Sequence, residues 1–276
     1  MTIEVNQLNF RYSERQILKN ITFSANPADL LCVLGPNGVG KSTLFRCMLG
    51  LSKNYTGEIF IEGESIRKMK TVELAKRIAY IPQSHHPTFN FSVLSTVLMG
   101  LTVHLKGASM PKTIHEEEAL AALDMLGIAH LWNRGYAEIS GGERQLALIA
   151  RAIVQKTKIL VMDEPTANLD YGNQMRVMAK VKELANQGYI IILSTHNPEH
   201  AFLYGNKALV IYKGEIIEMG NPKEIVTEGL LQQVYGVKVK LHDIDTGDGD
   251  VRVIVPNRKK EGGVKHVLDR EKYTVV

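Results

Sequence analysis

Two kinds of hydrophobic pattern alternate along this chain of 276 residues. Continuous apolar runs, which are typical of strands buried on both faces of a sheet, occur at 30–34, 78–81, 159–162 and 189–193. Stretches in which apolar and polar residues alternate occur at 3–6, 8–10, 17–18, 21–23 and 57–63. The alternating stretches are typical of antiparallel strands. Together the patterns predict an α/β fold with a mainly parallel sheet and an N-terminal antiparallel β subdomain.

A helical pattern separates the second and third of the continuous runs. From about Ser92 to Lys156, apolar residues recur every three or four positions, and Gly100, Gly107 and Pro111 interrupt them. This pattern predicts an inserted helical subdomain at about 90–156. Nearer the C-terminus, a turn at 213–214 between apolar stretches predicts a hairpin, and two further strands are expected at 237–241 and 251–255.

Composition and charge exclude several classes of function. Lysine and arginine outnumber aspartate and glutamate by 33 to 29, and a net charge of +4 is too small to indicate nucleic-acid binding. Cys32 and Cys47 fall in a predicted strand and a predicted helix, so we interpret both as core residues. No signal-peptide pattern is present, and no apolar run approaches the ~18–20 residues that cross a bilayer. A role at a membrane would therefore require a partner protein.

The segment from Gly35 to Thr43 carries the clearest chemistry. It has the pattern G-x-x-x-x-G-K-[ST] and lies between an apolar run and a helix-forming run, 44–49. Glycines let the backbone wrap a phosphate group, the helix N-terminus adds partial positive charge, and Lys41 adds a full charge. The Ser42 hydroxyl can hold Mg²⁺. We therefore expect this chain to bind a nucleoside triphosphate.

Two adjacent acids follow the third apolar run. Asp163, at the end of the predicted strand, can hold Mg²⁺ through its water shell, and Glu164 can polarise a water molecule for attack on the γ-phosphate. The acidic loop 245–250 faintly resembles a calcium-binding loop but lacks the closing glutamate, so we do not expect a metal there.

A second anion-binding element is predicted at Ser140. This serine and the two glycines after it open a strongly helical segment, so they present free N–H groups at a helix start. Two phosphate-binding elements are unexpected in a monomer. They suit two copies that pair head to tail, each closing the nucleotide site of the other.

Several motifs occur in one order and together resemble the nucleotide-binding subunit of ABC transporters. They are the phosphate loop, Gln83, 139–143, 159–164, 167–170 and His196. The resemblance runs from about residue 2 to residue 235. It implies a P-loop NTPase core, an ATPase domain over 1–235 and a short β-containing extension over 236–276. It also implies ATP and Mg²⁺ as cofactors and a homodimer that sandwiches the nucleotide.

The same resemblance implies a role for each site residue. Tyr12 would stack on adenine, Asp170 would communicate across the dimer, and Gln83, Glu164 and His196 would be catalytic. The other residues expected to bind the nucleotide are Gly35, Pro36, Asn37, Gly38, Gly40, Lys41, Ser42, Thr43, Ser140, Gly141 and Gly142. The residues expected at the metal are Ser42, Gln83 and Asp163.

Two positions depart from the family pattern. Ile139 replaces the usual leucine, which we expect to be harmless, and Glu143 replaces the commoner glutamine. Because the implied phosphate contacts come from a serine hydroxyl and a glycine N–H, the second change leaves the site intact but adds a nearby negative charge.

The segment 83–100 and the tail 231–237 resemble the importers of metal chelates, which include those for ferric siderophores, haem and cobalamin, and the related molybdate and tungstate systems. We interpret His85 and His86 as surface residues that face a permease. The resemblance implies a peripheral protein at the cytoplasmic face of the membrane, with membrane permease subunits as partners, an extracytoplasmic binding protein acting indirectly, and no nucleic acid. The alternatives are a non-transport ABC ATPase that acts on nucleic acid or ribosomes, and a regulatory module that barely hydrolyses ATP. The sequence does not name the cargo.

Overall fold

The computed structural model describes residues 1–83, 89–105, 111–247 and 249–257. Its centre is a six-stranded sheet in the order β10-β9-β3-β8-β7-β6, in which every neighbouring pair is parallel except β9 and β10. The bounds of these strands are β3 Leu30–Leu34, β6 Ile78–Ile81, β7 Ile159–Asp163, β8 Ile190–Ser194, β9 Lys207–Tyr212 and β10 Glu215–Gly220. The mainly parallel sheet predicted from the continuous apolar runs is confirmed.

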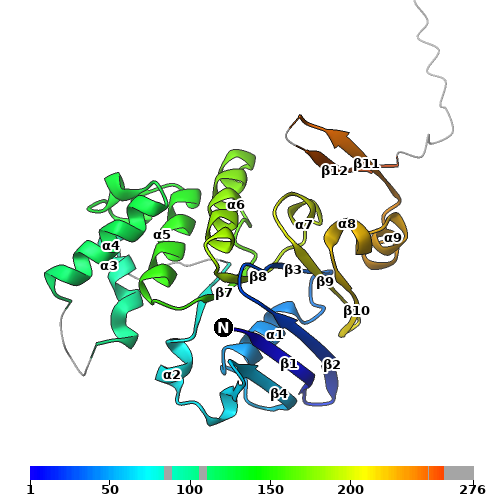
Figure 1. The fold of residues 1–276 in the computed structure, drawn as a ribbon, viewed down its shortest axis with the longest axis horizontal. Coiled ribbons are helices and arrows are strands. Elements are labelled where there is room, and N and C mark those ends of the chain that lie inside the picture. Colours follow the sequence, from blue (N-terminus) through cyan, green and yellow to red (C-terminus); the bar gives the residue numbers. More distant parts are fainter. Residues whose placement is uncertain (84–88, 106–110, 248, 258–276) are drawn as a thin grey trace, which may run out of the picture.

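A separate antiparallel sheet, in the order β2-β1-β4-β5, lies below the central sheet in Figure 1. Its strands are β1 Ile3–Tyr12, β2 Arg15–Ala25, β4 Tyr55–Ile61 and β5 Glu64–Ser65. The pieces expected at 3–6 and 8–10 form one strand, and those expected at 17–18 and 21–23 form another. The prediction split them because the alternation breaks at Gln7 and Asn20, where a positive φ and a shift of register mark β-bulges.

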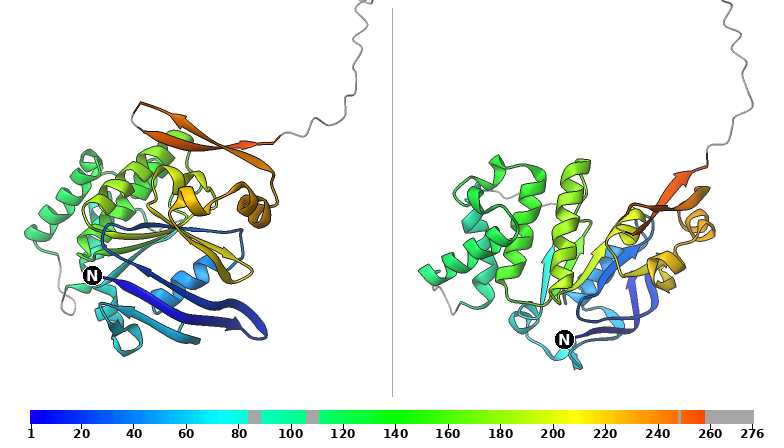
Figure 2. Two further views of the ribbon diagram at one scale, coloured as in Figure 1. Left: turned by 45° about the vertical axis from the view of Figure 1, so that its right-hand side comes forward. Right: turned by 45° about the horizontal axis from the view of Figure 1, so that its top comes forward.

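Helices lie on both faces of the central sheet (Figures 1 and 2). The longer helices are α1 Lys41–Met48, α4 Thr113–Met125, α5 Gly141–Val154, α6 Tyr171–Asn186 and α9 Glu228–Tyr235. The shorter helices are α2 Thr71–Ala75, α3 Val93–Leu98, α7 Glu199–Leu203 and α8 Pro222–Ile225, with 3₁₀ turns at Ile66–Lys68, Met99–Val103, Ala129–Leu131 and Tyr136–Glu138. The helical region from α3 to α5 lies at one side of the molecule, where the sequence predicted inserted helices.

The buried side chains form two cores, one on each face of the central sheet. Alternate residues of β3 divide between them: Cys32 joins the core with α5 and α6, and Val33 joins the core with α1 and the antiparallel sheet. Cys47 of α1 lies in the second core. Burial raises the pKa of both cysteine thiols to about 12, so both behave as core residues, as predicted.

The C-terminal strands β11 Val239–Asp245 and β12 Asp250–Pro256 pair as a hairpin at the upper right of Figure 1. The hairpin reaches α7, where the backbone N–H of Ile254 donates to Glu199. The sequence pattern does not predict α7, α8 or α9. The last two are specified by local caps, since the side chains of Asn221 and Thr227 accept hydrogen bonds from their first turns.

Candidate nucleotide site

The predicted phosphate loop joins β3 to α1. Gly35, Gly38 and Gly40 all have positive φ, and a side chain on Gly35 would come within 2.3 Å of the carbonyl oxygen of Ile211. Because α1 begins at Lys41, earlier than the 44–49 run suggests, Lys41, Ser42 and Thr43 form its first turn. Their N–H groups therefore belong to a free helix N-terminus, which favours an anion.

The Lys41 side chain folds back over this loop. Its ammonium group donates to the carbonyl oxygens of Gly35 at 2.7 Å and Pro36 at 3.2 Å. Burial lowers the pKa of Lys41, and the nearby carboxylates of Glu164 and Asp163 oppose that change. The cation is thus held at the point where the loop can offer it to a phosphate group.

A cavity of about 410 Å³ opens beside the loop. The described residues that line it are Arg15, Ile17, Asn37, Gly38, Gly40, Lys41, Ser42, Thr43, Gln83 and Glu164. The cavity unites the phosphate loop with two residues predicted from separate motifs. Sequence reasoning missed Arg15 and Ile17 because β2 carries no motif, and only the packing of β2 beside the loop brings them here.

Asp163 ends β7 and Glu164 follows it, beside the end of β8. Since β7 and β8 are parallel and in register, Asp163 pairs with Ser194, whose hydroxyl donates to the buried Asp163 carboxylate at 2.6 Å. The same hydroxyl accepts from the backbone N–H of Glu164 at 2.9 Å. Glu164 has a φ of 45°, a strained conformation that often occurs at functional sites. Sequence reasoning missed Ser194, although its place at the end of a parallel strand was a usable signal.

Two further side chains converge on the Glu164 carboxylate. The Gln83 amide donates to Glu164 Oε2 at 3.3 Å, and His196 Nδ1 lies 3.4 Å from the same oxygen. Gln83 follows β6 and His196 follows β8, so all three residues lie at the carboxyl edge of the parallel sheet. Edges of this kind are where open α/β sheets bind their ligands.

Ser140 caps α5 by a reciprocal arrangement. Its hydroxyl accepts from the N–H of Glu143 at 3.3 Å, and the Glu143 carboxylate accepts from the N–H of Ser140 at 2.8 Å. Hydrogen bonds that the Ser140 hydroxyl and then the Ser140 backbone N–H donate to the Glu143 carboxylate lower its pKa. The Glu143 charge is therefore engaged in capping the helix. Ser140, Gly141 and Gly142 are not among the described residues that line the phosphate-loop cavity.

Asp170 caps α6 and lies beside the start of α5. Asn173 donates to the Asp170 carboxylate through its backbone, at 2.9 Å, and through its side chain, at 2.7 Å. A side chain on Gly142 would come within 2.4 Å of the Asn173 amide oxygen. Asn173, which sequence reasoning missed, thus packs the serine–glycine motif against Asp170.

Tyr12 lies at the end of β1 and is 51% exposed, with its ring 4.7 Å from that of Phe10. It lines a cavity other than that of the phosphate loop, shared with Arg46 of α1.

Tyr235, at the end of α9, was not predicted, yet its hydroxyl accepts from the N–H of Gly35 at 3.2 Å.

The remaining expectations concern His85, His86, metal ions and the membrane. His85 and His86 lie outside the described residues. Where the structure is described, no cluster of three or more histidine, cysteine, aspartate or glutamate residues could hold a metal. Within those same ranges, no helix is long and apolar enough to cross a bilayer.

The known proteins to which this chain is similar belong to one family. The model of the ABC transporter family matches residues 18–167. An iron chelatin transport ATP-binding protein of Helicobacter pylori is 41% identical over 85% of this chain and 93% of its own length. The petrobactin import ATP-binding protein of Bacillus anthracis is 34% identical over 95% and 96%. A metal-chelate type ABC transporter solved in an inward-facing conformation superposes with a TM-score of 0.83 at 32% identity, over 94% of this chain and 98% of the solved one.

Proposed function

This chain belongs to the ATP-binding proteins of the ABC transporter family, and from that membership we propose that it is the ATP-hydrolysing subunit that powers import of a metal chelate, or a related small solute, through a partner membrane permease. The cargo class comprises iron–siderophores, haem, cobalamin, and molybdate or tungstate. The names of the relatives and of the solved transporter support the metal-chelate class. In this proposal the ATPase domain spans 1–235 and is followed by an extension over 236–276.

The observation that carries the proposal is the convergence of Gln83 and His196 on Glu164 at the edge of the phosphate-loop cavity. The two contacts fix the direction of the carboxylate, which accepts a proton from the water molecule that attacks the γ-phosphate. Lys41 and the N-terminus of α1 supply positive charge to the phosphate groups. The chain thus provides both the group that orients water and the electrostatic support for phosphoryl transfer.

The donor set suits Mg²⁺. The Ser42 hydroxyl, the Gln83 amide and the Asp163 carboxylate supply oxygen atoms, and Mg²⁺ is commonly held by one or two carboxylates together with water and substrate phosphates. Ser194 holds one oxygen of Asp163, which keeps the carboxylate aimed at this edge. When bound, the ion neutralises the charge that develops on the γ-phosphate.

A second copy of the chain completes the site. Because Ser140 and Gly142 lie outside the lining of the cavity in their own chain, we assign them to the γ-phosphate bound by the partner copy. Tyr12 supports adenine from the rim of the neighbouring cavity, and Asp170 links the two copies through Asn173 and Gly142. The dimer works at the cytoplasmic face of the membrane as a peripheral protein, and an extracytoplasmic binding protein acts indirectly.

The proposal is tested by affinity purification of tagged Glu164→Gln protein from detergent-solubilised native membranes in Mg-ATP. Mass spectrometry is expected to identify a permease with several membrane spans, whose identity narrows the cargo. Recovery of ribosomes, nucleic acid or soluble partners alone would assign the chain instead to the ABC ATPases that do not transport. The matched control is Glu183→Gln, which changes an exposed glutamate of α6 far from the site.

A further inference from the structure

A hydrogen bond joins the phosphate loop to a segment that carries none of the site motifs. The hydroxyl of Tyr235, the last residue of α9, accepts from the backbone N–H of Gly35 at 3.2 Å. Tyr235 is not among the described residues that line the phosphate-loop cavity, so it reaches the loop from outside the cavity. Any effect of Tyr235 on a bound nucleotide must therefore pass through Gly35.

The N–H of Gly35 is the first donor beyond the paired part of β3. The register of β3 with β9 ends at Leu34 and Val210, and its register with β8 ends at Val33. Gly35 is buried, and among the described residues the Tyr235 hydroxyl is the partner of its N–H. Because a buried N–H group without a partner is unfavourable, this hydroxyl fixes the direction of the peptide that opens the loop.

Gly35 requires a contact of this kind because it has no side chain to hold it. Its φ of 146° lies in the region that favours glycine, and a side chain there would come within 2.3 Å of the carbonyl oxygen of Ile211. Glycine fits this close approach to β9, but glycine is also the residue whose backbone turns most freely. The entrance of the loop therefore depends on an external restraint, which Tyr235 supplies.

The same glycine holds Lys41. The Gly35 carbonyl oxygen accepts from the Lys41 ammonium group at 2.7 Å, while the Gly35 N–H donates to Tyr235. The two groups belong to adjacent peptide units that share the α-carbon of Gly35, so rotation at this residue would move the oxygen that Lys41 contacts. Hydrogen bonds thus connect the Tyr235 hydroxyl, through Gly35, to the cation expected to meet the phosphate groups.

The position of the Tyr235 hydroxyl is specified by α9. The helix begins at Thr227, whose side chain caps the first turn, and it ends directly after Tyr235 because Gly236 has a φ of 74°. Leu231 and Val234 of the same helix are buried in the core with α5 and α6. Burial raises the pKa of Tyr235 to about 12, so the hydroxyl stays neutral at physiological pH and acts through its geometry.

We propose that Tyr235 is a positioning residue for nucleotide binding: its hydroxyl holds the Gly35 peptide, and through it Lys41, in the arrangement that receives the phosphate groups. The inference rests on the proposed function of the phosphate loop. It adds the end of α9 to the parts of the chain that determine nucleotide affinity. Because the lysine of such a loop holds the phosphate groups before and during hydrolysis, loss of the hydroxyl should weaken binding more than turnover.

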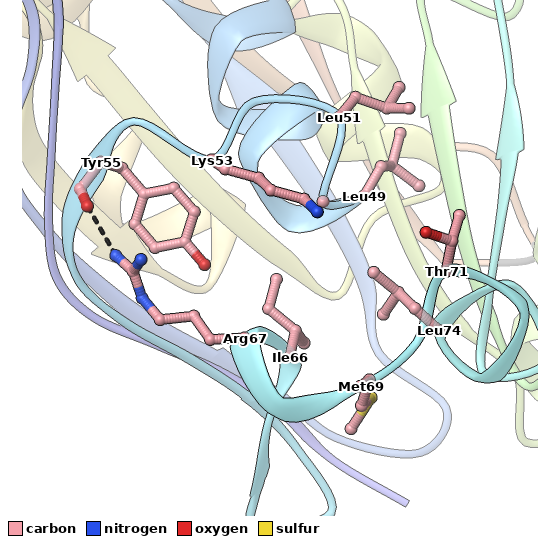
Figure 3. Close-up of a pocket in the computed structure, with 10 residues that line it drawn as sticks. Leu49, Leu51, Lys53, Tyr55, Ile66, Arg67, Met69, Thr71 and Leu74 are labelled. Atoms are coloured by element: carbon pink, nitrogen blue, oxygen red, sulfur yellow. Dashed lines mark hydrogen bonds between the residues drawn. The ribbon is translucent and has the colours of Figure 1, made fainter.

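The opposite end of α1 provides the matched control. There a cavity of about 180 Å³ lies between the loop after α1, β4 and α2 (Figure 3). Tyr55 lines it and is buried, and its hydroxyl has no hydrogen-bond partner among the described residues. The dashed line in Figure 3 joins Arg67 to the backbone oxygen of Tyr55. Tyr55→Phe therefore removes a hydroxyl near α1 and no contact with the loop, whereas Tyr235→Phe keeps the ring and removes that contact.

Tyr235→Phe should raise the Kd for Mg-ADP and the KM for ATP about three- to tenfold, as expected for the loss of one hydrogen bond. The change in kcat should stay below about twofold. Isothermal titration and steady-state phosphate release measure these constants, and Tyr55→Phe should match the parent in all three. A lower Tm with unchanged Kd and KM would show that Tyr235 serves packing alone and would overturn the proposal. An equal rise in Tyr55→Phe would overturn it as well.

Hydrogen exchange at Gly35 follows the contact directly. In protein with isotope-labelled glycine, the Gly35 amide should exchange at least about tenfold faster in Tyr235→Phe than in the parent or in Tyr55→Phe. Unchanged exchange would reject the restraint at this peptide.

Lys41→Ala separates this inference from the proposed function. It should abolish Mg-ADP binding, and normal affinity in that variant would overturn the assignment of the phosphate loop itself. Normal affinity in Tyr235→Phe, together with lost affinity in Lys41→Ala, would overturn the positioning role alone.

Discussion

The two halves of the proposed nucleotide site differ in how far one chain completes them. At the edge of the central sheet, Asp163 and Ser194 are buried and hydrogen-bonded to each other, and Gln83 and His196 already contact Glu164. At the start of α5, Ser140 is exposed, and among the described residues its side chain bonds only to Glu143 of its own helix. The sheet edge is therefore organised within the monomer, whereas the helix start presents its groups outward.

Under the proposed function, this difference assigns the chemical step to the sheet edge and the assembly of the dimer to the start of α5. A rigid parallel sheet holds catalytic groups within the narrow distances that proton transfer requires. In the dimer we propose, the exposed helix N-terminus joins the reaction only when the partner copy brings a phosphate to it, so turnover depends on dimer closure. Substitutions at the two places should consequently fail in different ways.

Glu164→Gln should have the largest effect. Loss of the proposed proton acceptor is expected to lower the rate of ATP hydrolysis by about 10²–10⁴-fold, while ATP binding persists and a closed dimer accumulates. Phosphate release and size-exclusion chromatography in Mg-ATP measure both results. Rapid turnover by this variant would remove Glu164 from the mechanism.

Gly142→Ala should disrupt the half of the proposed site at the start of α5. The new methyl group would meet the Asn173 amide, so we expect ATPase activity to fall about tenfold or more and the ATP-dependent dimer to be lost, with ATP affinity of the monomer retained. Gly229→Ala, whose nearest contact is 3.9 Å away, is the control. Adding Asn173→Ala should restore part of the dimer, and loss of ATP binding in the single variant would contradict the separation of the two halves.

Ser194→Ala should weaken the sheet edge without removing it. The change leaves the Glu164 N–H and the buried Asp163 carboxylate without the shared hydroxyl, at a cost of about 1–3 kcal/mol of folding free energy. We expect kcat to fall while dimerisation in ATP persists. Thermal unfolding and steady-state kinetics separate the effects, and an unchanged kcat per folded molecule would make Ser194 structural only.

Glu143→Gln should have the smallest effect at neutral pH. The pKa of Glu143 is lowered in the folded protein, so its carboxylate stabilises the fold above its ordinary pKa near 4.5 and loses that contribution as the pH falls through the folded value. The variant should therefore show a smaller fall in Tm than the parent as the pH is lowered from 6 to well below 4.5. Identical acid dependence of Tm in the two proteins would show that the reciprocal cap does not couple the protonation of Glu143 to the stability of the fold.

The sequence by itself determined the parts of this protein that depend on neighbouring residues. Continuous apolar runs located β7 and β8, and a side-chain spacing of about 3.6 residues, which follows from local backbone geometry, located the helical region from α3 to α5. The glycine pattern located the phosphate loop for the same reason. Where a bulge at Gln7 shifted the register, the same local reasoning divided one strand into two.

Only the tertiary structure decided which distant groups meet. The register of β7 with β8 puts Ser194 on Asp163, and the packing of α9 puts Tyr235 on Gly35, a pair separated by 200 positions. Likewise, a cavity of about 390 Å³ lined by Thr71, Tyr80 and Arg151 arises where α2, β6 and α5 meet, although no single segment encodes it. These contacts depend on strand order and helix packing, which minimise the free energy of the whole chain and leave no local pattern in its sequence.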